Sequence, residues 1–278
     1  MANEVAAANS TAIKFMFRSR KRTAKGTESR IYVEANEALA TIAIGQNDRP
    51  LSPERERAEL DHVASLANSP SQLQKKEAHE KEEAQHTLCI VKALPDAFRY
   101  EYAGTENSTD GLGKIGDQLV RLKFSPNPSY TPPTRVEQVL AGMQGYVLID
   151  PRAKRLASID GTLFEDVTFG WGIFGRLNQG GHFRVQQADV GDGFWEITHL
   201  SLNLNGKILL IKNLSIVSDE VFTDFQRLPN DVPFARGVEI LQNEKVKLAQ
   251  NLDGTENARA GNERNTAIEK STHQRENP

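Results

Sequence analysis

The sequence is poor in the features that mark several large classes of protein. Its 278 residues contain one cysteine, Cys89, which excludes an internal disulfide and a zinc site built from cysteines. The formal net charge is only −3, so no global field favours nucleic acid or an anionic membrane. No apolar run approaches the roughly 20 residues that a membrane-spanning helix needs. We therefore expect no transmembrane segment and no nucleic-acid partner.

Short segments of alternating apolar and polar residues fill most of the chain, and this period is typical of strands. Turn residues separate them, notably Asp150-Pro151, Gly191-Asp192-Gly193 and the hairpin signal Asn205-Gly206. Short turns between successive strands indicate an antiparallel meander, and we expect residues 97–227 to form one strongly curved antiparallel sheet. The predicted strands are 13–17, 28–34, 39–44, 98–102, 119–124, 134–140, 143–149, 154–166, 182–190, 194–204, 207–217 and 219–226.

Residues 52–94 have a different character and predict an insertion of two helices. Ser52 can cap the first helix and Pro53 suits its first position. The second helix should end before Pro95. The expected fold class is mainly β (α+β): a curved antiparallel sheet, or incomplete β-barrel, covered by this helical pair.

The predicted domain organisation is one half-barrel domain over residues 1–243, followed by a tail. Apolar residues nearly vanish from 244–278, and this segment cannot offset its ordering entropy by burial. We therefore expect it to be disordered.

The glycine-rich stretch 169–177 matches the dinucleotide-binding pattern G-x-G-x-x-G. That fingerprint requires a following helix, but only four residues separate Gly175 from Gly180, and a strand pattern follows. The stretch therefore predicts a hairpin loop that either folds back onto the core or contacts lipid or a partner. Ile208–Ile211 would be apolar on both faces of a strand, which indicates cover on both sides or a ligand. The candidate ligand or lipid contacts are Phe169, Trp171, Ile173, Phe174, Leu177, Leu209 and Ile211.

No combination of residues predicts catalysis or a cofactor. Glu83 and His86 form an E-x-x-H unit, but the partner helix lacks the second copy that a di-metal bundle needs. His182 and His199 have acids nearby in the sequence, without metal-ligand spacing or a nucleophile in a G-x-S-x-G elbow. We expect no enzyme activity, no metal and no cofactor.

Several motifs stand in a fixed order within residues 1–228. They are Leu51-Ser52-Pro53-Glu54, Leu94-Pro95-Asp96-Ala97-Phe98, Arg121–Pro128, Ile149-Asp150-Pro151, Lys154-Arg155-Leu156, Ile159-Asp160-Gly161, Phe169–Gly172 and Gly180-Gly181-His182-Phe183. In these motifs the sequence resembles exported bacterial proteins of unassigned function. That group is distantly similar to the outer-membrane lipoprotein-sorting proteins of the LolA/LolB type. The long charged helix pair and the lack of an N-terminal lipid-attachment cysteine depart from that type.

This resemblance implies an open antiparallel barrel with an apolar cavity for acyl chains. It leads us to expect a non-enzymatic periplasmic protein that binds an apolar ligand or a lipidated protein, with contact to a membrane surface. Residues 1–9 show no signal peptide, which suits a processed chain; a cytoplasmic location is the alternative. The alternative function is a protein-interaction module of the cell envelope without a small-molecule ligand, and a hydrolase comes third.

Overall fold

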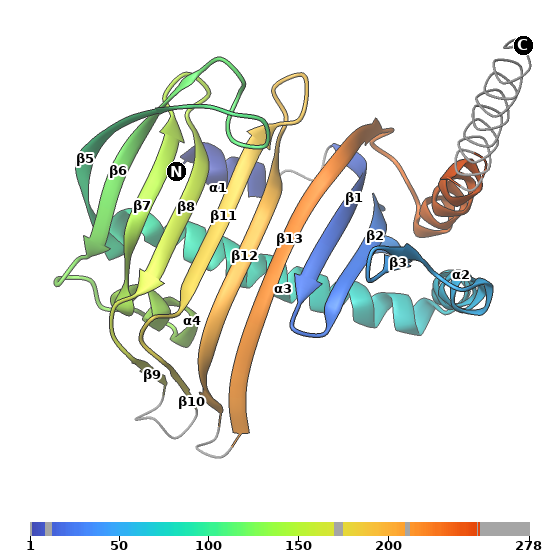
Figure 1. The fold of residues 1–278 in the computed structure, drawn as a ribbon, viewed down its shortest axis with the longest axis horizontal. Helices are drawn as coiled ribbons and strands as arrows, with labels where there is room; N and C mark the ends of the chain where they lie inside the picture. The colour runs from blue at the N-terminus through green and yellow to red at the C-terminus, as the bar shows by residue number, and fades with distance from the viewer. Residues whose placement is uncertain (1, 9–12, 170–174, 209–211, 249, 251–278) are drawn as a thin grey trace, which may run out of the picture.

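The computed structural model describes residues 2–8, 13–169, 175–208, 212–248 and 250. Within these ranges thirteen strands form one sheet in the order β4-β3-β2-β1-β13-β12-β11-β8-β7-β6-β5, with the β9–β10 hairpin attached beside β12 (Figure 1). Neighbouring strands pair antiparallel, and the sheet does not close into a barrel. The predicted fold class is therefore confirmed.

The elements have the following bounds. The strands are β1 (Lys14–Thr23), β2 (Gly26–Glu34), β3 (Leu39–Gln46), β4 (Arg49–Pro50), β5 (Phe98–Asn107), β6 (Gln118–Pro126), β7 (Met143–Asp150), β8 (Arg155–Leu163), β9 (Val167–Phe169), β10 (Gly175–Leu177), β11 (His182–Asp189), β12 (Trp195–Ile208) and β13 (Lys212–Leu228). The helices are α1 (Ala2–Ala8), α2 (Pro53–Ala67), α3 (Pro70–Ala97), α4 (Arg135–Gln138) and the short 3-10 helix η1 (Val139–Gly142). A C-terminal helix covers residues 234–248.

The long helix α3 crosses one face of the sheet from the β3 end to the β5 end (Figure 1). In its first half, Glu80 accepts a hydrogen bond from the backbone N–H of Leu39 on β3 at 2.9 Å. Near its end, the hydroxyl of Tyr100 on β5 donates to the carbonyl oxygen of Leu94 at 2.8 Å. The helix between these two points rises about 21 Å, whereas the strands from β3 to β5 would span about 43 Å in a flat sheet. The sheet must therefore bow away from α3, and we call the face toward this helix the concave face.

Two apolar cores lie at the two ends of the bowed sheet. The first core lies at the β3 end, where α2 and the C-terminal helix pack against β1, β2 and β3; its most buried members include Ile31, Val33, Ile42, Val63, Phe234 and Leu241. The second core lies between the last turns of α3, the α4–η1 segment and the strands β5 to β8; its members include Leu94, Phe98, Phe124, Leu140, Val147 and Leu163.

One predicted strand, residues 134–140, is wrong: the segment forms α4 and η1. A capping box begins the helix, in which the Thr134 hydroxyl accepts from the Glu137 backbone N–H at 3.3 Å. In return, the Glu137 carboxylate accepts from the Thr134 backbone N–H at 3.1 Å. The two orphan donors at the helix start are thus satisfied locally, which outweighs the apolar alternation of the segment.

The predicted hairpin turn at Asn205-Gly206 is also wrong. These residues lie inside a continuous β12–β13 ladder, where Asn205 pairs with Ser215 and Gly206 with Leu214. A Cβ atom at position 206 would stand 2.1 Å from the carbonyl oxygen of Arg176 on β10. Glycine is required here because another strand passes close by, and not because the chain turns.

One helix end lies further along the chain than predicted, and a C-terminal helix that was not predicted enters the segment expected to be a tail. α3 continues through Pro95 and ends at Ala97. The C-terminal helix continues past residue 243, and its Glu244 pairs with Arg18 at 2.9 Å while Leu248 packs against the first core. Residues 251–278, the rest of the expected tail, lie outside the described residues.

Candidate functional site

The concave face carries a row of apolar side chains along β12 and β13. Phe183 and Val185 of β11 pack against the second core, so they lie on this face. Leu202 and Leu200 of β12 stand directly opposite these two residues and therefore share the face. The same register continues onto β13. Together these side chains form what we call the apolar stripe: Leu200, Leu202, Leu214, Ile216 and Phe222.

The apolar stripe belongs to neither core. All five of its side chains are half-buried, and none of them is a member of the first or second core. Leu204 connects the stripe to the second core, because it packs against that core and stands opposite Ile216. The stripe is thus an apolar surface that begins beside the second core and continues along β12 and β13. No other described side chain covers it completely there.

Aromatic rings enclose the β1 side of the stripe. The ring of Phe17 stacks on Tyr32 at 5.0 Å and on Phe225 at 5.3 Å, and its edge meets Phe222 at 6.0 Å between centroids. Phe15 joins the group through an edge contact to Phe225 at 6.2 Å. Offset and edge-to-face rings of this kind form a stiff wall, because each ring is fixed by its neighbours.

A neutralised polar group lies between the stripe and these rings. Glu220, which stands opposite Leu200, is 6% exposed; its carboxylate accepts from the Ser19 hydroxyl at 2.8 Å and pairs with the Lys21 ammonium at 3.3 Å. Burial raises the pKa of the adjacent Tyr32 hydroxyl, so this group stays protonated. The floor of the site therefore presents paired polar groups and apolar surface, which suits an uncharged chain.

The middle of α3 does not pack on the sheet. All seven residues from 81 to 87, about two turns of helix, are exposed on every side. Its main contacts are with α1, α2, α4, η1 and β5, which lie toward its two ends. The helix therefore stands over the central strands as a strap, and this follows from the difference between its length and the arc of the sheet.

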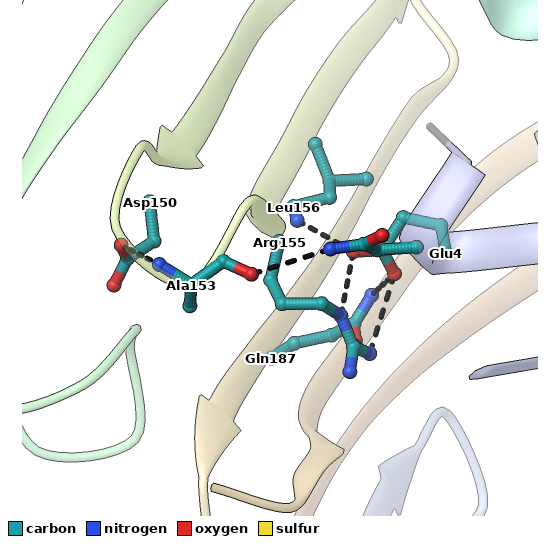
Figure 2. Close-up of polar contacts among 7 residues, drawn as sticks. Glu4, Asp150, Ala153, Arg155, Leu156 and Gln187 are labelled. Atoms are coloured by element: carbon teal, nitrogen blue, oxygen red, sulfur yellow. Dashed lines mark hydrogen bonds and ion pairs between the residues drawn. The ribbon is translucent and has the colours of Figure 1, made fainter. Parts of the chain in front are cut away.

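The short helix α1 is fixed to the concave face by one buried acid, Glu4 (Figure 2). Its carboxylate accepts from the Arg155 guanidinium at 2.8 Å and from the Leu156 backbone N–H at 2.7 Å, and the Gln187 amide lies at 3.4 Å. The side chain of Glu4 is 7% exposed and that of Arg155 is 14% exposed, so this ion pair is largely desolvated. α1 thereby covers the end of the concave face that is remote from the β9–β10 hairpin (Figure 1).

A second acid near α1 titrates abnormally. Burial, reinforced by the negative charge of Glu34, raises the pKa of Glu196 to about 7, although Arg155 opposes this change. Burial also raises the pKa of Glu34 itself, against a hydrogen bond from the Phe15 backbone N–H at 2.9 Å. Both acids thus report a poorly hydrated end of the concave face.

The second core leaves only a small space beneath the end of α3. This apolar cavity measures about 140 Å³, and Pro95, Tyr100, Leu122 and Val147 are among its lining residues. Ligand pockets usually have volumes above roughly 300 Å³. Within the described residues this part of the molecule is therefore a filled core, whereas the side chains of the stripe stay half-buried.

The described residues that flank the predicted ligand contacts lie at one end of the sheet. A single row of paired residues crosses four strands there: Phe169 of β9, Gly175 of β10, Ile208 of β12 and Lys212 of β13. In the sequence, the stretches 170–174 and 209–211 directly follow Phe169 and Ile208 of this row. Trp171, Ile173, Phe174, Leu209 and Ile211 lie outside the described residues. Phe169 and Leu177 are described, and both pack partly against the second core.

The hairpin prediction for residues 169–177 is confirmed by the antiparallel pairing of β9 with β10. The dinucleotide pattern is therefore not followed by a crossover helix. Alternation along one strand is enough to put Leu200, Leu202 and Leu204 on the same face, but it does not show that Phe17, Tyr32 and Phe222 join them. These rings come from β1, β2 and β13, and only the long-range register brings them together.

The two sheet histidines form separate pairs on the opposite, convex face. His182 lies 2.8 Å from Asp160, which also accepts from Arg184. His199 uses both ring nitrogens, one toward Asp219 at 2.7 Å and the other toward Gln186 at 3.0 Å. Neither ring nitrogen of His199 is left to accept a proton from a nucleophile.

Within the described ranges there is no group of three or more histidine, cysteine or acidic side chains that could hold a metal ion. Among the same residues, no helix combines the length and the apolar character needed to cross a membrane.

Comparison with known proteins gives little further information. No protein-family model matches the sequence, and no curated protein matches it. Among solved structures, the chain is similar to a DUF1329 family protein from Desulfovibrio piger, with 10% sequence identity and a TM-score of 0.23. The similarity covers 81% of this chain and 89% of that chain. None of these comparisons shows a relation to the LolA/LolB type, which remains a prediction.

Proposed function

We propose that the protein binds an apolar chain, such as an acyl chain, along the apolar stripe of its concave face. The observation that carries the proposal is the combination of five half-buried apolar side chains outside both cores with a helix whose residues 81–87 are exposed on every side. Contiguous apolar surface that no core covers is typical of binding sites. The aromatic wall and the paired Glu220 add a rigid boundary without a free charge.

The geometry also gives the ligand a direction. α1 and its buried Glu4 cover one end of the concave face, whereas Leu214 and Ile216 continue the stripe toward the row that contains Ile208 and Lys212. An apolar chain would therefore enter from this end. The sequence places Trp171, Phe174 and Leu209 in the stretches that leave the same row, which supports contact between this end and a lipid surface. A periplasmic location and a role in carrying the ligand are part of the same proposal.

Ligand binding is tested by paired substitutions on β13. Ile216 points to the concave face, and its neighbour Val217 points to the convex face, where it is 48% exposed. We expect Ile216→Gln to weaken binding of a fluorescent C16 fatty acid at least about tenfold, because the amide group would be buried without a partner. Val217→Gln is the matched control and should bind the fatty acid as the unmodified protein does. The absence of saturable binding to the unmodified protein, or equal weakening by both substitutions, would contradict the proposal.

Membrane contact is tested separately, by a substitution within the glycine-rich stretch 169–177. Trp171→Ser removes the largest apolar side chain of that stretch and should weaken liposome binding. Melting temperature is measured on the same samples, so that a structural loss is distinguished from a loss of lipid contact. Unchanged liposome binding would end the lipid-contact part of the proposal while leaving fatty-acid binding to be judged by the β13 variants.

A further inference from the structure

The strands β13 and β1 differ in length, and this leaves part of one strand edge without a neighbour. Their ladder ends where Thr23 stands opposite Ser218. Residues 212–217 of β13 continue beyond this point and pair only with β12. Within the described residues no strand lies on their other side, and the lower part of β13 is open on the side away from β12 (Figure 1).

The edges at the two ends of the main strand order are protected. At the β3 end, the backbone N–H groups of Leu39 and Ala43 donate to the carboxylates of Glu80 and Glu59, both at 2.9 Å. At the β5 end, the register shifts between Tyr102 and Thr105, and Gly104 adopts a positive φ of 105°. Capped amides and bulges are the usual devices that prevent an edge from pairing with another chain.

The edge at residues 212–217 has neither device. Its ladder with β12 continues from Lys212 to Val221 without a register shift, and the segment contains no proline. Leu214 and Ile216 face the concave side, whereas Asn213 and Ser215 face the convex side. The segment is therefore a regular template for one more strand, with an apolar side and a polar side.

The end of this edge carries positive charge. Lys212, the first residue of β13, is exposed and shares the concave face with Leu214, whereas the exposed Lys207 pairs with Asn213 and points to the convex face. Among the described residues neither lysine takes part in an ion pair, although Arg176 nearby pairs with Asp166. A negative group placed at this point would gain an attraction that no described acid already supplies.

We propose that the free edge of β13 docks the extended C-terminal segment of a partner protein, which adds a strand antiparallel to residues 212–217. An antiparallel strand runs toward the tip of the β12–β13 hairpin, so its C-terminal carboxylate comes to Lys212. Its side chains alternate, with apolar groups beside Leu214 and Ile216 and polar groups beside Asn213 and Ser215. This docking uses the backbone edge, and it does not depend on an apolar ligand in the stripe.

The test uses a fluorescent hexapeptide of alternating threonine and valine with a free C-terminal carboxylate, measured by anisotropy. Two further peptides carry N-methyl groups on one or the other alternate set of amides. In strand pairing one set faces β13 and the other faces solvent. We therefore expect one N-methylated peptide to bind about tenfold more weakly and the other to bind like the parent.

The charge is tested with a fourth peptide, whose carboxylate is replaced by an amide. It should bind the unmodified protein about threefold to tenfold more weakly, and Lys212→Ala should abolish the difference between acid and amide. Lys25→Ala, an exposed lysine in the β1–β2 turn, is the control and should preserve that difference. Absence of saturable peptide binding, or equal binding of both N-methylated peptides and their parent, would overturn edge docking. Equal binding of acid and amide would overturn the role of Lys212.

Discussion

The two ends of α3 and its middle meet the same sheet in different ways. At the ends, side chains such as Leu73 and Leu94 join packed cores, and Glu80 caps an edge amide of β3. In the middle, residues 81–87 are exposed, and the apolar side chains of β12 and β13 beneath them are only half-buried. The difference shows that α3 contributes to packed cores through its two ends, whereas the apolar side chains beneath its middle stay half-buried. The proposed binding of an apolar chain would account for this half-buried apolar surface.

The largest expected effect compares one phenylalanine from each region. Phe124 is 0% exposed in the second core, with its ring 4.6 Å from that of Phe98. Phe124→Ala should lower the free energy of unfolding by about 3–5 kcal/mol, because it leaves a cavity. Phe222→Ala, in the half-buried stripe, should lower it by less than about 1.5 kcal/mol. Urea denaturation of both variants measures this, and equal losses would refute the distinction between core and stripe.

The ion pair that holds α1 should have the next largest effect. Glu4→Ala leaves the Arg155 guanidinium and the Leu156 backbone N–H without their shared acceptor. Removal of one partner from a buried pair costs about 3 kcal/mol. Glu82→Ala, on the exposed part of α3, is the control and should leave the free energy of unfolding within about 0.5 kcal/mol. Chemical denaturation at neutral pH distinguishes the two, and a neutral Glu4→Ala would show that α1 does not contribute to folding.

Glu196 provides a pH test of how little water reaches the end of the concave face that α1 covers. Its pKa rises from the ordinary value of 4.5 to about 7 on folding, so the folded state binds more protons between these values. Stability is therefore full below about pH 4.5 and falls as pH rises through about 7. After allowance for solvent screening, the decrease attributable to this group is about 2 kcal/mol. Glu196→Gln should remove this decrease, and an unchanged pH profile of the variant would contradict the assignment.

The smallest expected effect tests whether the middle of α3 is separated from the sheet. Ala84 lies in the exposed middle of the helix. Ala84→Trp should change the free energy of unfolding by less than about 0.5 kcal/mol, because the larger ring meets solvent and not the sheet. A helix packed on the sheet would instead lose about 1–3 kcal/mol through overpacking. Thermal unfolding distinguishes these two outcomes. The fluorescence of the new indole would also report an apolar ligand bound between α3 and the sheet.

Most of the fold could be read from local patterns. Strict alternation predicted most of the strands, and Ser52-Pro53 predicted the start of α2, where the Ser52 hydroxyl accepts from the Arg55 backbone N–H at 3.4 Å. The failures have local causes too. Thr134 and Glu137 formed a capping box in a segment interpreted as a strand, and Gly206 is needed for the approach of β10 and not for a turn.

The candidate site was less accessible from the sequence. The predicted contacts Phe169 and Leu177 share one end of the sheet with Ile208, which the pairing of β9, β10 and β12 shows. The aromatic wall and the buried Glu220 were not predicted, because their partners come from strands about 200 residues apart, as in the bond from Ser19 to Glu220. Alternation assigns a residue to a face of its own strand, but it does not say which distant strand lies beside it.

The sequence by itself determined the class of this protein: an antiparallel sheet with short turns and an inserted helix pair, because periodicity and turn chemistry act over a few residues. The sequence also predicted a curved sheet, but only the tertiary structure decided that it bows away from α3, because this bow follows from the difference between the length of α3 and the breadth of the sheet it crosses. It also decided that the stripe remains outside both cores. The same holds for residues 212–217 of β13, which extend beyond the end of the neighbouring strand β1. These features depend on strand order and register, which are set by contacts between residues far apart in the chain.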